Sequence, residues 1–408
     1  MRVVHISRID RGGAANGCIG LHHGLLDQGI DSQLLVLEKT RSDIRACHSL
    51  YNHRHTLQIA KVKNKLWGCK RYKKRGLPSG YEDFTFPYSS HRPESHELVK
   101  SAHIVNLHWV ANFINYPTFF KQLSKPVFWT LHDMNPFSGG CHFVEGFPID
   151  AYCKHIRSNT KVKTEALSKS NVTVISPSQW LAHQSSQSEA FNSFPHHVIP
   201  YSVDVETFRA RDVADMRQKF DIAGNKPVLL FVAARMQNKR KGLEYLLKAM
   251  RSPLLKDKFE LVVVGAISEN MDLPAHTKVL GQLGSAQQMA CVYAAADLFV
   301  TPAIEDNLPN TVLESLCCGT AVVAFNIGGM PDMVTDGKNG ILSNTVDEDG
   351  LATAISRAVG CTFDRHSISQ RARECYAPVN QAKAYIDLYQ EQLTATPSRG
   401  RPKKETIR

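Results

Sequence analysis

Short apolar runs alternate with stretches of helical periodicity along most of this chain, which is typical of parallel α/β layers. Two such series are separated by a break at residues 198–204. We predict strands at residues 2–6, 33–37, 104–108, 127–131 and 172–176, then at 228–233, 260–264, 298–301 and 321–325. Helices are predicted between them, for example at residues 242–250 and 285–295. Residues 48–91 have the composition of a loop.

This pattern predicts two doubly wound domains that face each other across one cleft, with ligands at the carboxyl ends of the strands. We place the first domain at residues 1–200 and the second at 201–375. A last helix, within residues 376–394, is expected to pack back on the first domain. The basic, Pro-containing tail at 395–408 is expected to lack fixed structure.

The stretch from Asp306 to Gly319 is the most informative single segment. It follows an apolar run and reads as a helix capped by Asn307, with Pro309 in its first turn and Gly319 ending it in the left-handed conformation. Free N–H groups at such a helix N-terminus bind anions. Carboxylates at Asp306 and Glu314 bracket that point and suit sugar or ribose hydroxyls, so the segment indicates a sugar nucleotide. The plainer alternative is a capped helix with two solvated acids.

Cations and glycines follow two other strands of the second domain. Arg235 and Lys241 come after residues 228–233, with Lys239 and Arg240 between them, and would suit a diphosphate. The glycine loop at residues 328–332 follows the strand at 321–325 and suits backbone contact with a ligand, or a tight turn.

The first loop of the chain, residues 12–17, imitates a dinucleotide fingerprint, with Glu38 roughly where a ribose-binding acid would fall. The match is weak because Ala14 stands where a pyrophosphate favours Gly. Gly12 and Gly13 otherwise form a loop that touches substrate across the cleft, or a plain turn before a helix.

Two histidines, His108 and His132, each end an apolar strand, and Asp133 follows the second. A single histidine there is more often structural. Two at adjacent strand ends are better candidates for a cleft, where an imidazole takes a proton or bonds a sugar hydroxyl.

The chain carries a net charge of +11, and eight of its Lys and Arg residues lie between Lys61 and Arg75. Leu66, Trp67 and Tyr72 interleave with them, which suits an anionic membrane surface as well as a solvated basic face. No nucleic-acid motif accompanies this run, so no nucleic-acid partner is predicted. No apolar window is long enough for a transmembrane helix, and the N-terminus reads as a strand rather than a signal peptide, so we expect a cytoplasmic protein.

The ten cysteines are scattered, as expected for reduced structural residues. Cys141, His142, Cys153 and His155 form one cluster, but their spacing matches no zinc pattern. We therefore predict no metal site.

Taken together, these motifs resemble the retaining glycosyltransferases of family 4, which have the GT-B fold. The resemblance covers nearly the whole chain, from Gly12 to Gly340. The run from Trp129 to His142 resembles a branch common among bacterial surface-polysaccharide and colanic-acid-type transferases. The most specific matches are Arg235 with Lys241-Gly242, the segment from Glu305 to Glu314, and the segments at residues 318–323, 328–332 and 336–340.

The family signature pairs two acids at the spacing of Asp306 and Glu314, which are eight positions apart. Asp306 stands where Glu is usual, and Glu305 is the alternative occupant. Arg235 and Lys241 resemble the family's cationic pair, although their spacing is one residue longer than usual, and Arg240 is the alternative partner. Asp332 likewise stands where Glu is commoner.

The resemblance implies a role for each matching residue. Glu314 would bind the ribose, Asp306 would face the donor sugar, and the amides of Asn310 and Thr311 would bind the diphosphate. The implied catalytic set is Asp306, His132, Arg235 and Lys241. The implied donor-binding set is Gly12, Gly13, Arg235, Lys241, Asp306, Asn307, Asn310, Thr311 and Glu314, and His108 and Asp133 would lie on the acceptor side.

We therefore expect a retaining glycosyltransferase with an N-terminal acceptor-binding domain and a C-terminal nucleotide-sugar domain. It would move a sugar from a nucleotide-diphosphate sugar to a glycan or lipid-linked acceptor, without a cofactor. The alternatives are a nucleotide-sugar epimerase of the same fold, a nicotinamide-dependent oxidoreductase and a non-catalytic nucleotide-sugar-binding partner. The base, the sugar, the acceptor and the oligomeric state are left open by the sequence.

Overall fold

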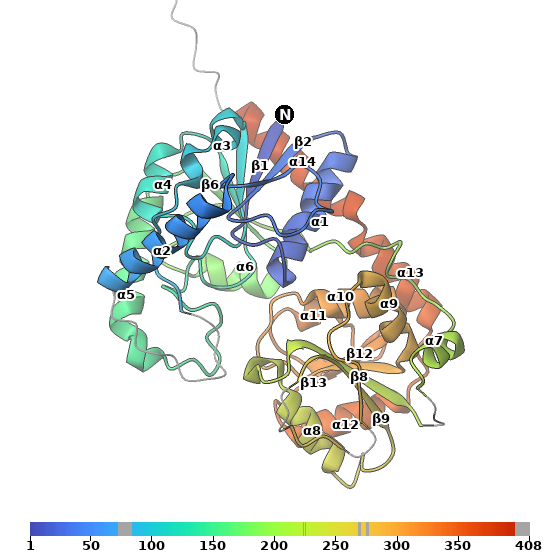
Figure 1. Ribbon diagram of the computed structural model, residues 1–408. Coiled ribbons are helices and arrows are strands. Elements are labelled where there is room, and N and C mark those ends of the chain that lie inside the picture. Colours follow the sequence, from blue (N-terminus) through green and yellow to red (C-terminus); the bar gives the residue numbers. More distant parts are fainter. Residues whose placement is uncertain (72–83, 223, 225, 268–270, 275–276, 396–408) are drawn as a thin grey trace, which may run out of the picture.

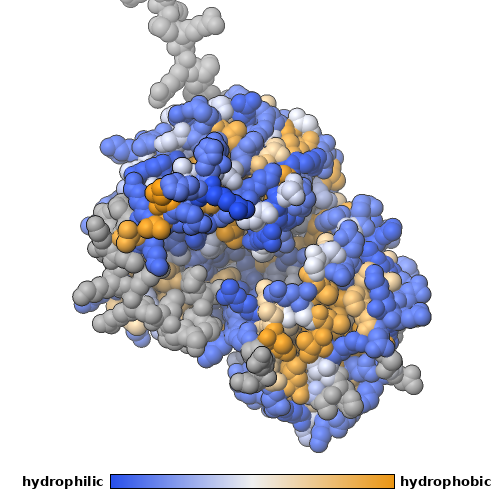
Figure 2. Space-filling view, in the orientation of Figure 1, coloured by the Kyte–Doolittle hydropathy of each residue, from blue (hydrophilic) through white to orange (hydrophobic). Residues whose placement is uncertain are grey.

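The computed structural model describes the chain outside residues 72–83, 223, 225, 268–270, 275–276 and 396–408. The described residues form two α/β domains (Figure 1). Figure 2 shows the surface hollowed between them. The predicted C-terminal tail lies outside the described residues, as does the end of the basic run that begins at Lys61.

The N-terminal domain contains a seven-stranded parallel sheet in the order β3-β2-β1-β4-β5-β6-β7. The strand order reverses between β1 and β4, so a crevice opens there at the carboxyl ends of the strands. The strands are β1 (Arg2–Ile6), β2 (Asp31–Val36), β3 (Cys47–Ser49), β4 (Ile104–Leu107), β5 (Val127–Thr130), β6 (Val172–Ser176) and β7 (His196–Val198).

The C-terminal domain contains a six-stranded parallel sheet in the order β10-β9-β8-β11-β12-β13, with its reversal between β8 and β11. Most central strands are buried along their whole length, which is why they read as continuous apolar runs in the sequence. The strands are β8 (Val228–Arg235), β9 (Glu260–Ala266), β10 (Thr277–Val279), β11 (Leu298–Thr301), β12 (Ala321–Phe325) and β13 (Gly340–Ser343).

Helices connect the strands and cover both sheets (Figure 1). The N-terminal helices are α1 (Gly13–Asp27), α2 (Arg54–Arg71), η1 (Pro93–Ser95), α3 (Glu97–Ser101), α4 (Tyr116–Gln122), α5 (Ile149–Leu167) and α6 (Gln179–Ser186). The helices of the C-terminal domain are α7 (Val213–Lys219), η2 (Lys239–Lys241), α8 (Leu243–Arg251), α9 (Ala286–Ala295), α10 (Asn310–Cys317), α11 (Met330–Met333), α12 (Glu348–Val359) and α13 (Arg365–Tyr376). The last helix of the chain is α14 (Pro378–Ala395). The two domains and their parallel sheets confirm the predicted doubly wound fold.

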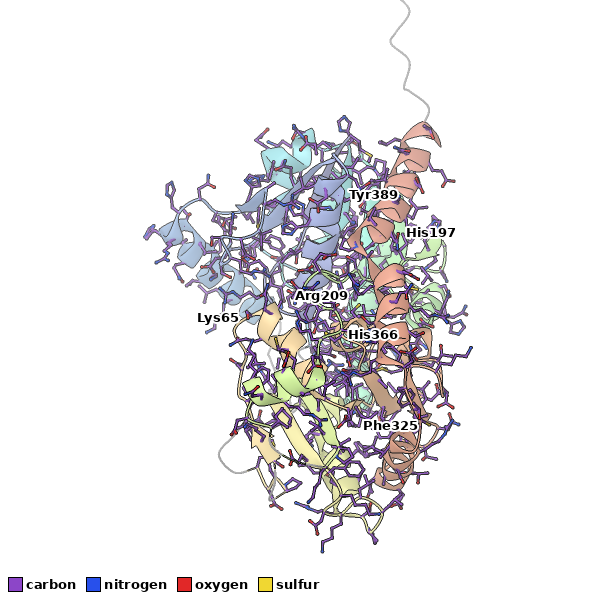
Figure 3. All side chains as sticks on the ribbon, turned by 90° about the vertical axis from the view of Figure 1, so that its right-hand side faces the viewer. Lys65, His197, Arg209, Phe325, His366 and Tyr389 are labelled. Atoms are coloured by element: carbon purple, nitrogen blue, oxygen red, sulfur yellow. The ribbon has the colours of Figure 1, made fainter. Side chains whose placement is uncertain are left out.

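The chain crosses between the domains twice. After β7 it enters the C-terminal domain, and after α13 it returns as α14, which packs against α1. Figure 3 shows Tyr389 of α14 beside the N-terminal domain and His366 of α13 beside the C-terminal one. Ala382, Tyr385 and Tyr389 are fully buried in a core shared with β1 and α1. The last helix therefore belongs structurally to the first domain.

The described part of residues 48–91 is not loop throughout, contrary to what their composition had suggested. They contain part of β3 and the helix α2. Ile59, Val62 and Leu66 are each more than half exposed in α2, whereas Leu57 is buried. Few apolar side chains of this helix face the core, and lysines separate them, so the sequence lacks the usual contrast between an apolar and a polar face.

Candidate active site

The carboxylate of Asp306 is buried between two cations. Nζ of Lys241 donates to its Oδ2 at 2.6 Å, and Nη1 of Arg240 lies 3.2 Å from the same oxygen. Burial raises the pKa of Asp306, but the two cations outweigh this effect and lower it to about 2. The structure thus brings together the carboxylate and the Lys that the sequence predicted, with Arg240 as a third member.

Glu305 points away from this cluster. Its Oε2 accepts from the backbone N–H groups of Val144 and Glu145, at 2.9 and 2.7 Å, in a loop of the N-terminal domain. Arg240 joins the two features, because its guanidinium lies 3.7 Å from the Phe143 ring centroid and donates to the Glu305 carbonyl. Of the two acids, Asp306 therefore faces the cations, while Glu305 connects the domains.

The helix after β11 begins later than predicted. α10 starts at Asn310 with Pro309 as its N-cap, so the prediction that Asn307 caps this helix is wrong. Oδ1 of Asn307 instead accepts from Ser178 Oγ of the N-terminal domain at 2.5 Å, and this interdomain bond competes with capping. The left-handed conformation predicted for Gly319 is confirmed, with φ of 78°.

The N-terminus of α10 lies against the N-terminus of α1, which begins at Gly13, so residues 13–17 are helical rather than the predicted loop. Nδ2 of Asn310 donates to the Gly13 carbonyl at 3.1 Å, which brings two predicted donor-binding residues from different domains together. Gly12, next to Gly13, is in the left-handed region with φ of 92°. Thr311 follows Asn310 in the first turn of α10 and is partly exposed.

Glu314 lies one turn further along α10. Its Oε2 accepts from the hydroxyl of Tyr293 at 3.1 Å, and burial raises its pKa to about 7. No cation is among the groups that shift the pKa of Glu314. A carboxylate held this way has free lone pairs for hydroxyl groups of a ligand.

Two glycines allow the loops of this site to approach each other. A Cβ on Gly242, where φ is 72°, would meet the Pro302 carbonyl oxygen at 1.7 Å, and one on Gly328, where φ is 54°, would meet that of Asp306 at 2.0 Å. Each position therefore requires glycine for both conformation and space.

Arg235 ends β8 and is exposed, whereas Asp306 is buried. Asp332 is also placed between domains, since its Oδ2 accepts from the backbone N–H of Gln179 at 2.6 Å. Glu38, the possible ribose-binding acid of the first domain, pairs instead with Lys61 at 2.6 Å.

His132 is fixed through both ring nitrogens. Nδ1 lies 2.7 Å from the hydroxyl of Tyr201, and Nε2 lies 3.0 Å from Nδ1 of His108. Burial lowers the pKa of His132 to about 4, so the ring is neutral at pH 7. Its donor-contacting role stays a prediction, and a ligand that bonds to either nitrogen must displace a protein partner.

Asp133 is buried and holds its own loop. Its carboxylate accepts from Trp109 Nε1 at 2.9 Å and from the backbone N–H of Asn135 at 2.9 Å, and lies 2.6 Å from His142 Nδ1. His108 is likewise only 2% exposed. The acceptor-side role of both residues stays a prediction, and in this geometry they would act through their neighbours.

Sequence reasoning missed Tyr201, Tyr293 and Ser178, which hold His132, Glu314 and Asn307. Each lies far in sequence from the residue that it contacts. The one available signal was that Tyr201 falls in the break between the two α/β series.

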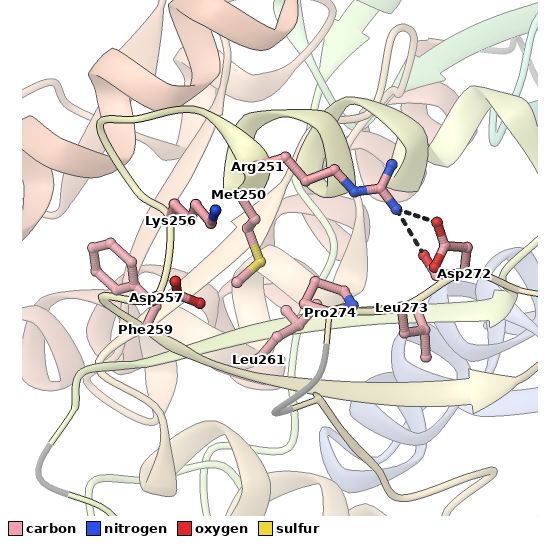
Figure 4. Close-up of a pocket in the computed structure, with 9 residues that line it drawn as sticks. All are labelled: Met250, Arg251, Lys256, Asp257, Phe259, Leu261, Asp272, Leu273 and Pro274. Carbon is pink, nitrogen blue, oxygen red and sulfur yellow. Dashed lines mark hydrogen bonds and ion pairs between the residues drawn. The ribbon is translucent and has the colours of Figure 1, made fainter.

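A cavity of about 380 Å³ lies elsewhere in the C-terminal domain, between the end of α8 and the start of β9 (Figure 4). Arg251 and Asp272 form an ion pair at its rim. None of the predicted site residues lines this cavity.

Comparison with known proteins finds similar glycosyltransferases, and the family match lies within the C-terminal domain. Residues 226–360 match the family described as "Glycosyl transferases group 1". The chain is 31% identical over 215 residues to a D-inositol 3-phosphate glycosyltransferase of Saccharomonospora viridis, covering 47% of this chain and 49% of that protein. It is 28% identical over 225 residues to the lipopolysaccharide 1,2-N-acetylglucosaminetransferase of Salmonella typhimurium, covering 51% and 58%. The chain thus spans about half the length of these curated relatives.

Solved structures match over nearly the whole chain. A sucrose-phosphate synthase from Thermosynechococcus elongatus has a TM-score of 0.67 at 16% identity, covering 97% of this chain and 100% of that one. Anabaena HepE in complex with UDP-glucose has a TM-score of 0.65 at 16% identity, with the same coverage. The fold is therefore that of the GT-B glycosyltransferases. Within this fold, residues 226–360 of the C-terminal domain match the group 1 glycosyl transferases.

Proposed function

We propose that this protein is a retaining glycosyltransferase of surface-polysaccharide synthesis. It moves a sugar from a nucleotide-diphosphate sugar to a hydroxyl of a glycan or lipid-linked oligosaccharide, as in the colanic-acid-type branch. The observation that carries the proposal is the cluster of Asp306, Lys241 and Arg240 beside the N-terminus of α10.

The chemistry follows from charge. Negative charge develops on the leaving diphosphate, and preorganised cations and amides stabilise it. Lys241 supplies such a cation, Arg235 a second one from the exposed end of β8, and Asn310 and Thr311 the amides. Because Asp306 already neutralises Lys241, the diphosphate competes with this carboxylate for the cation. Closure of the domains over the donor excludes water and limits hydrolysis.

Glu314 is assigned to the ribose. Its carboxylate lies one helical turn from Asn310, where a nucleotide with its diphosphate at the helix end would extend its ribose. HepE was solved with UDP and with UDP-glucose, which makes uridine nucleotides the first donors to test.

We further propose contact with an anionic membrane at the cytoplasmic face, through the basic run that begins at Lys61. In the part of the chain that the structure describes, no helix is long and apolar enough to span a membrane. In α2, Ile59, Val62 and Leu66 are exposed at helical spacing next to Lys63 and Lys65. Figure 2 shows apolar surface at this edge of the N-terminal domain. Apolar insertion together with basic side chains is the usual composition of an interfacial helix.

The proposal is tested by thermal shift with nucleotide diphosphates and nucleotide sugars, with NAD and NADP as controls, followed by turnover assays with the donor that binds. A rise in melting temperature with one nucleotide sugar, and sugar transfer with the anomeric configuration retained, is expected. Binding without turnover would favour the non-catalytic partner, release of an epimerised sugar the epimerase, and a shift with NAD or NADP alone the oxidoreductase.

A further inference from the structure

Three histidines from three neighbouring strands form a continuous array, which we call the histidine array: His5, His108 and His132. His5 and His108 are buried, and His132 is partly exposed. Nδ1 of His5 lies 2.9 Å from Nε2 of His108, and Nδ1 of His108 lies 3.0 Å from Nε2 of His132. The array ends at Tyr201, whose hydroxyl lies 2.7 Å from Nδ1 of His132 and donates to the Leu131 carbonyl at 3.2 Å. Tyr201 lies in the first crossover between the domains.

A proton, rather than a metal ion, fits between these rings. The donor atoms of His5, His108 and Cys18 lie within 4.8 Å of one another, as in a metal site. Two imidazole nitrogens bound to one tetrahedral zinc, at about 2.0–2.1 Å each, would be roughly 3.3 Å apart. The observed 2.9 Å between His5 and His108 is a hydrogen-bond distance.

All three rings are neutral at pH 7. Burial is the main cause that lowers the pKa of His5, His108 and His132, and neighbouring His22 lowers that of His5 further. Asp133 opposes this effect at His132 without overcoming it. A neutral imidazole has one N–H and one lone pair, so each ring donates on one side and accepts on the other.

Only two proton arrangements satisfy every link. In the first, every ring carries its proton on Nδ1, so that His5 donates to His108, His108 to His132 and His132 to Tyr201, which donates to Leu131. In the second, every proton is on Nε2 and the direction reverses. The second leaves the Nε2–H of His5 without an acceptor, since this buried atom has no partner, and it loses the bond to Leu131.

The first arrangement makes one hydrogen bond more and leaves only a bare lone pair on His5 Nε2. Buried donors without a partner are rarer than buried acceptors without one. We propose that His5 and His108 are positioning residues that hold His132 as the Nδ1–H tautomer and, through Tyr201, fix the interdomain crossover to the N-terminal sheet. Any effect of this tautomer on donor binding rests on the proposed function, whereas the tautomer itself follows from the hydrogen bonds alone.

The experiment is nuclear magnetic resonance on the full chain with ¹⁵N-labelled histidine, using long-range correlations to read which nitrogen of each ring carries the proton. The resonances are assigned with single His→Gln variants. In the wild-type protein we expect Nδ1–H at all three positions. An Nε2–H tautomer at any of the three would overturn the proposal. No donor or turnover is needed, so a failed transferase assay leaves this result unaffected.

Coupling along the array is tested with Tyr201→Phe. This variant removes the terminal acceptor, so each proton arrangement then leaves one donor without a protein partner, at His132 in the first and at His5 in the second. We expect the nitrogen shifts to move at His132, His108 and also His5, which does not contact Tyr201. The matched control is Tyr389→Phe, because Tyr389 is also buried and its hydroxyl accepts from Asn106 at 2.8 Å outside the array. Shifts confined to His132, or equal in both variants, would contradict coupling.

Discussion

Nζ of Lys241 lies 2.6 Å from the carboxylate of Asp306, so the cation assigned to the leaving diphosphate is already paired within the protein. Asp306→Asn removes the negative charge that pairs with Lys241, at a residue that is only 7% exposed. Loss of one member of a buried pair typically costs about 3–5 kcal/mol. We expect a lower melting temperature and a larger stabilisation by a nucleoside diphosphate than in the wild type, because Lys241 is then free. An equal ligand-induced shift in both proteins would remove Lys241 from the diphosphate site.

The same pair sets an acid limit. The pKa of Asp306 is lowered to about 2 in the folded protein, below its ordinary value of 3.8. The contribution of ionised Asp306 to the free energy of unfolding is therefore present above pH 3.8 and is lost as the pH falls toward 2. The difference corresponds to about 2 kcal/mol. Denaturant titrations measure the free energy of unfolding of the wild type and of Asp306→Asn. The difference between the two should shrink by this amount from pH 5 to pH 2. A difference that does not change with pH would contradict the lowered pKa of Asp306.

Glu314 predicts the opposite dependence. Its pKa is raised from 4.5 to about 7, so the folded protein binds this proton more tightly than the unfolded chain. Ionisation then lowers stability progressively as the pH rises from 4.5 to 7, by up to about 3 kcal/mol. Glu314→Gln should therefore be more stable than the wild type at pH 8 and similar at pH 4.5, as measured by urea titration.

Nucleotide binding provides a second test of Glu314. The Glu314→Gln variant should bind the nucleotide more weakly by about 1–3 kcal/mol, through loss of a charge-assisted bond. Tyr293→Phe is the control, because it removes the hydroxyl that contacts Glu314 and keeps the carboxylate. Unchanged affinity in Glu314→Gln would place the ribose elsewhere.

Glu305 is expected to hold the domains closed. Glu305→Gln keeps an acceptor oxygen but removes the charge that strengthens the bonds to Val144 and Glu145. A loss of about 1.4 kcal/mol would speed amide hydrogen exchange in this loop tenfold. The exposed neighbour Glu145, changed to Gln, is the control. Exchange that is as slow in Glu305→Gln as in the control would show that the contact does not govern closure.

Membrane contact is tested by charge reversal on α2. Lys63→Glu with Lys65→Glu should reduce co-sedimentation with anionic vesicles at low salt, and the difference should shrink as salt screens the charges. The matched control is Lys256→Glu with Lys258→Glu, two exposed lysines of the C-terminal domain. Equal binding of both double variants would leave α2 as a solvated face.

The sequence predicted the inner strands of both sheets, because buried parallel strands are continuous apolar runs, as in β11 and β12. It missed the short edge strands β3, β7, β10 and β13. It also assigned Asp306 and Lys241 to one site, and the structure brings them into contact because both follow the carboxyl ends of adjacent strands. Local signals were less reliable at Asn307, where a tertiary bond to Ser178 replaced the expected cap.

The contacts that fix the site were not predictable from local patterns. His5 gave no signal because it lies within an apolar strand, and its partner His108 is 103 positions away. Helix α2 was missed because three of its apolar side chains, Ile59, Val62 and Leu66, are exposed. The contact between His5 and His108 depends on β1 and β4 being neighbours in the sheet, and local sequence patterns do not specify the order of strands in a sheet.

The two crossings between the domains lie side by side. The Val203 N–H donates to the Tyr376 carbonyl at 2.9 Å, and Ser202 Oγ donates to Gln381 Oε1 at 2.8 Å. A single connecting segment would allow one domain to rotate freely relative to the other. Two segments that are hydrogen-bonded to each other restrict this rotation and so keep the same residues of the two domains facing each other.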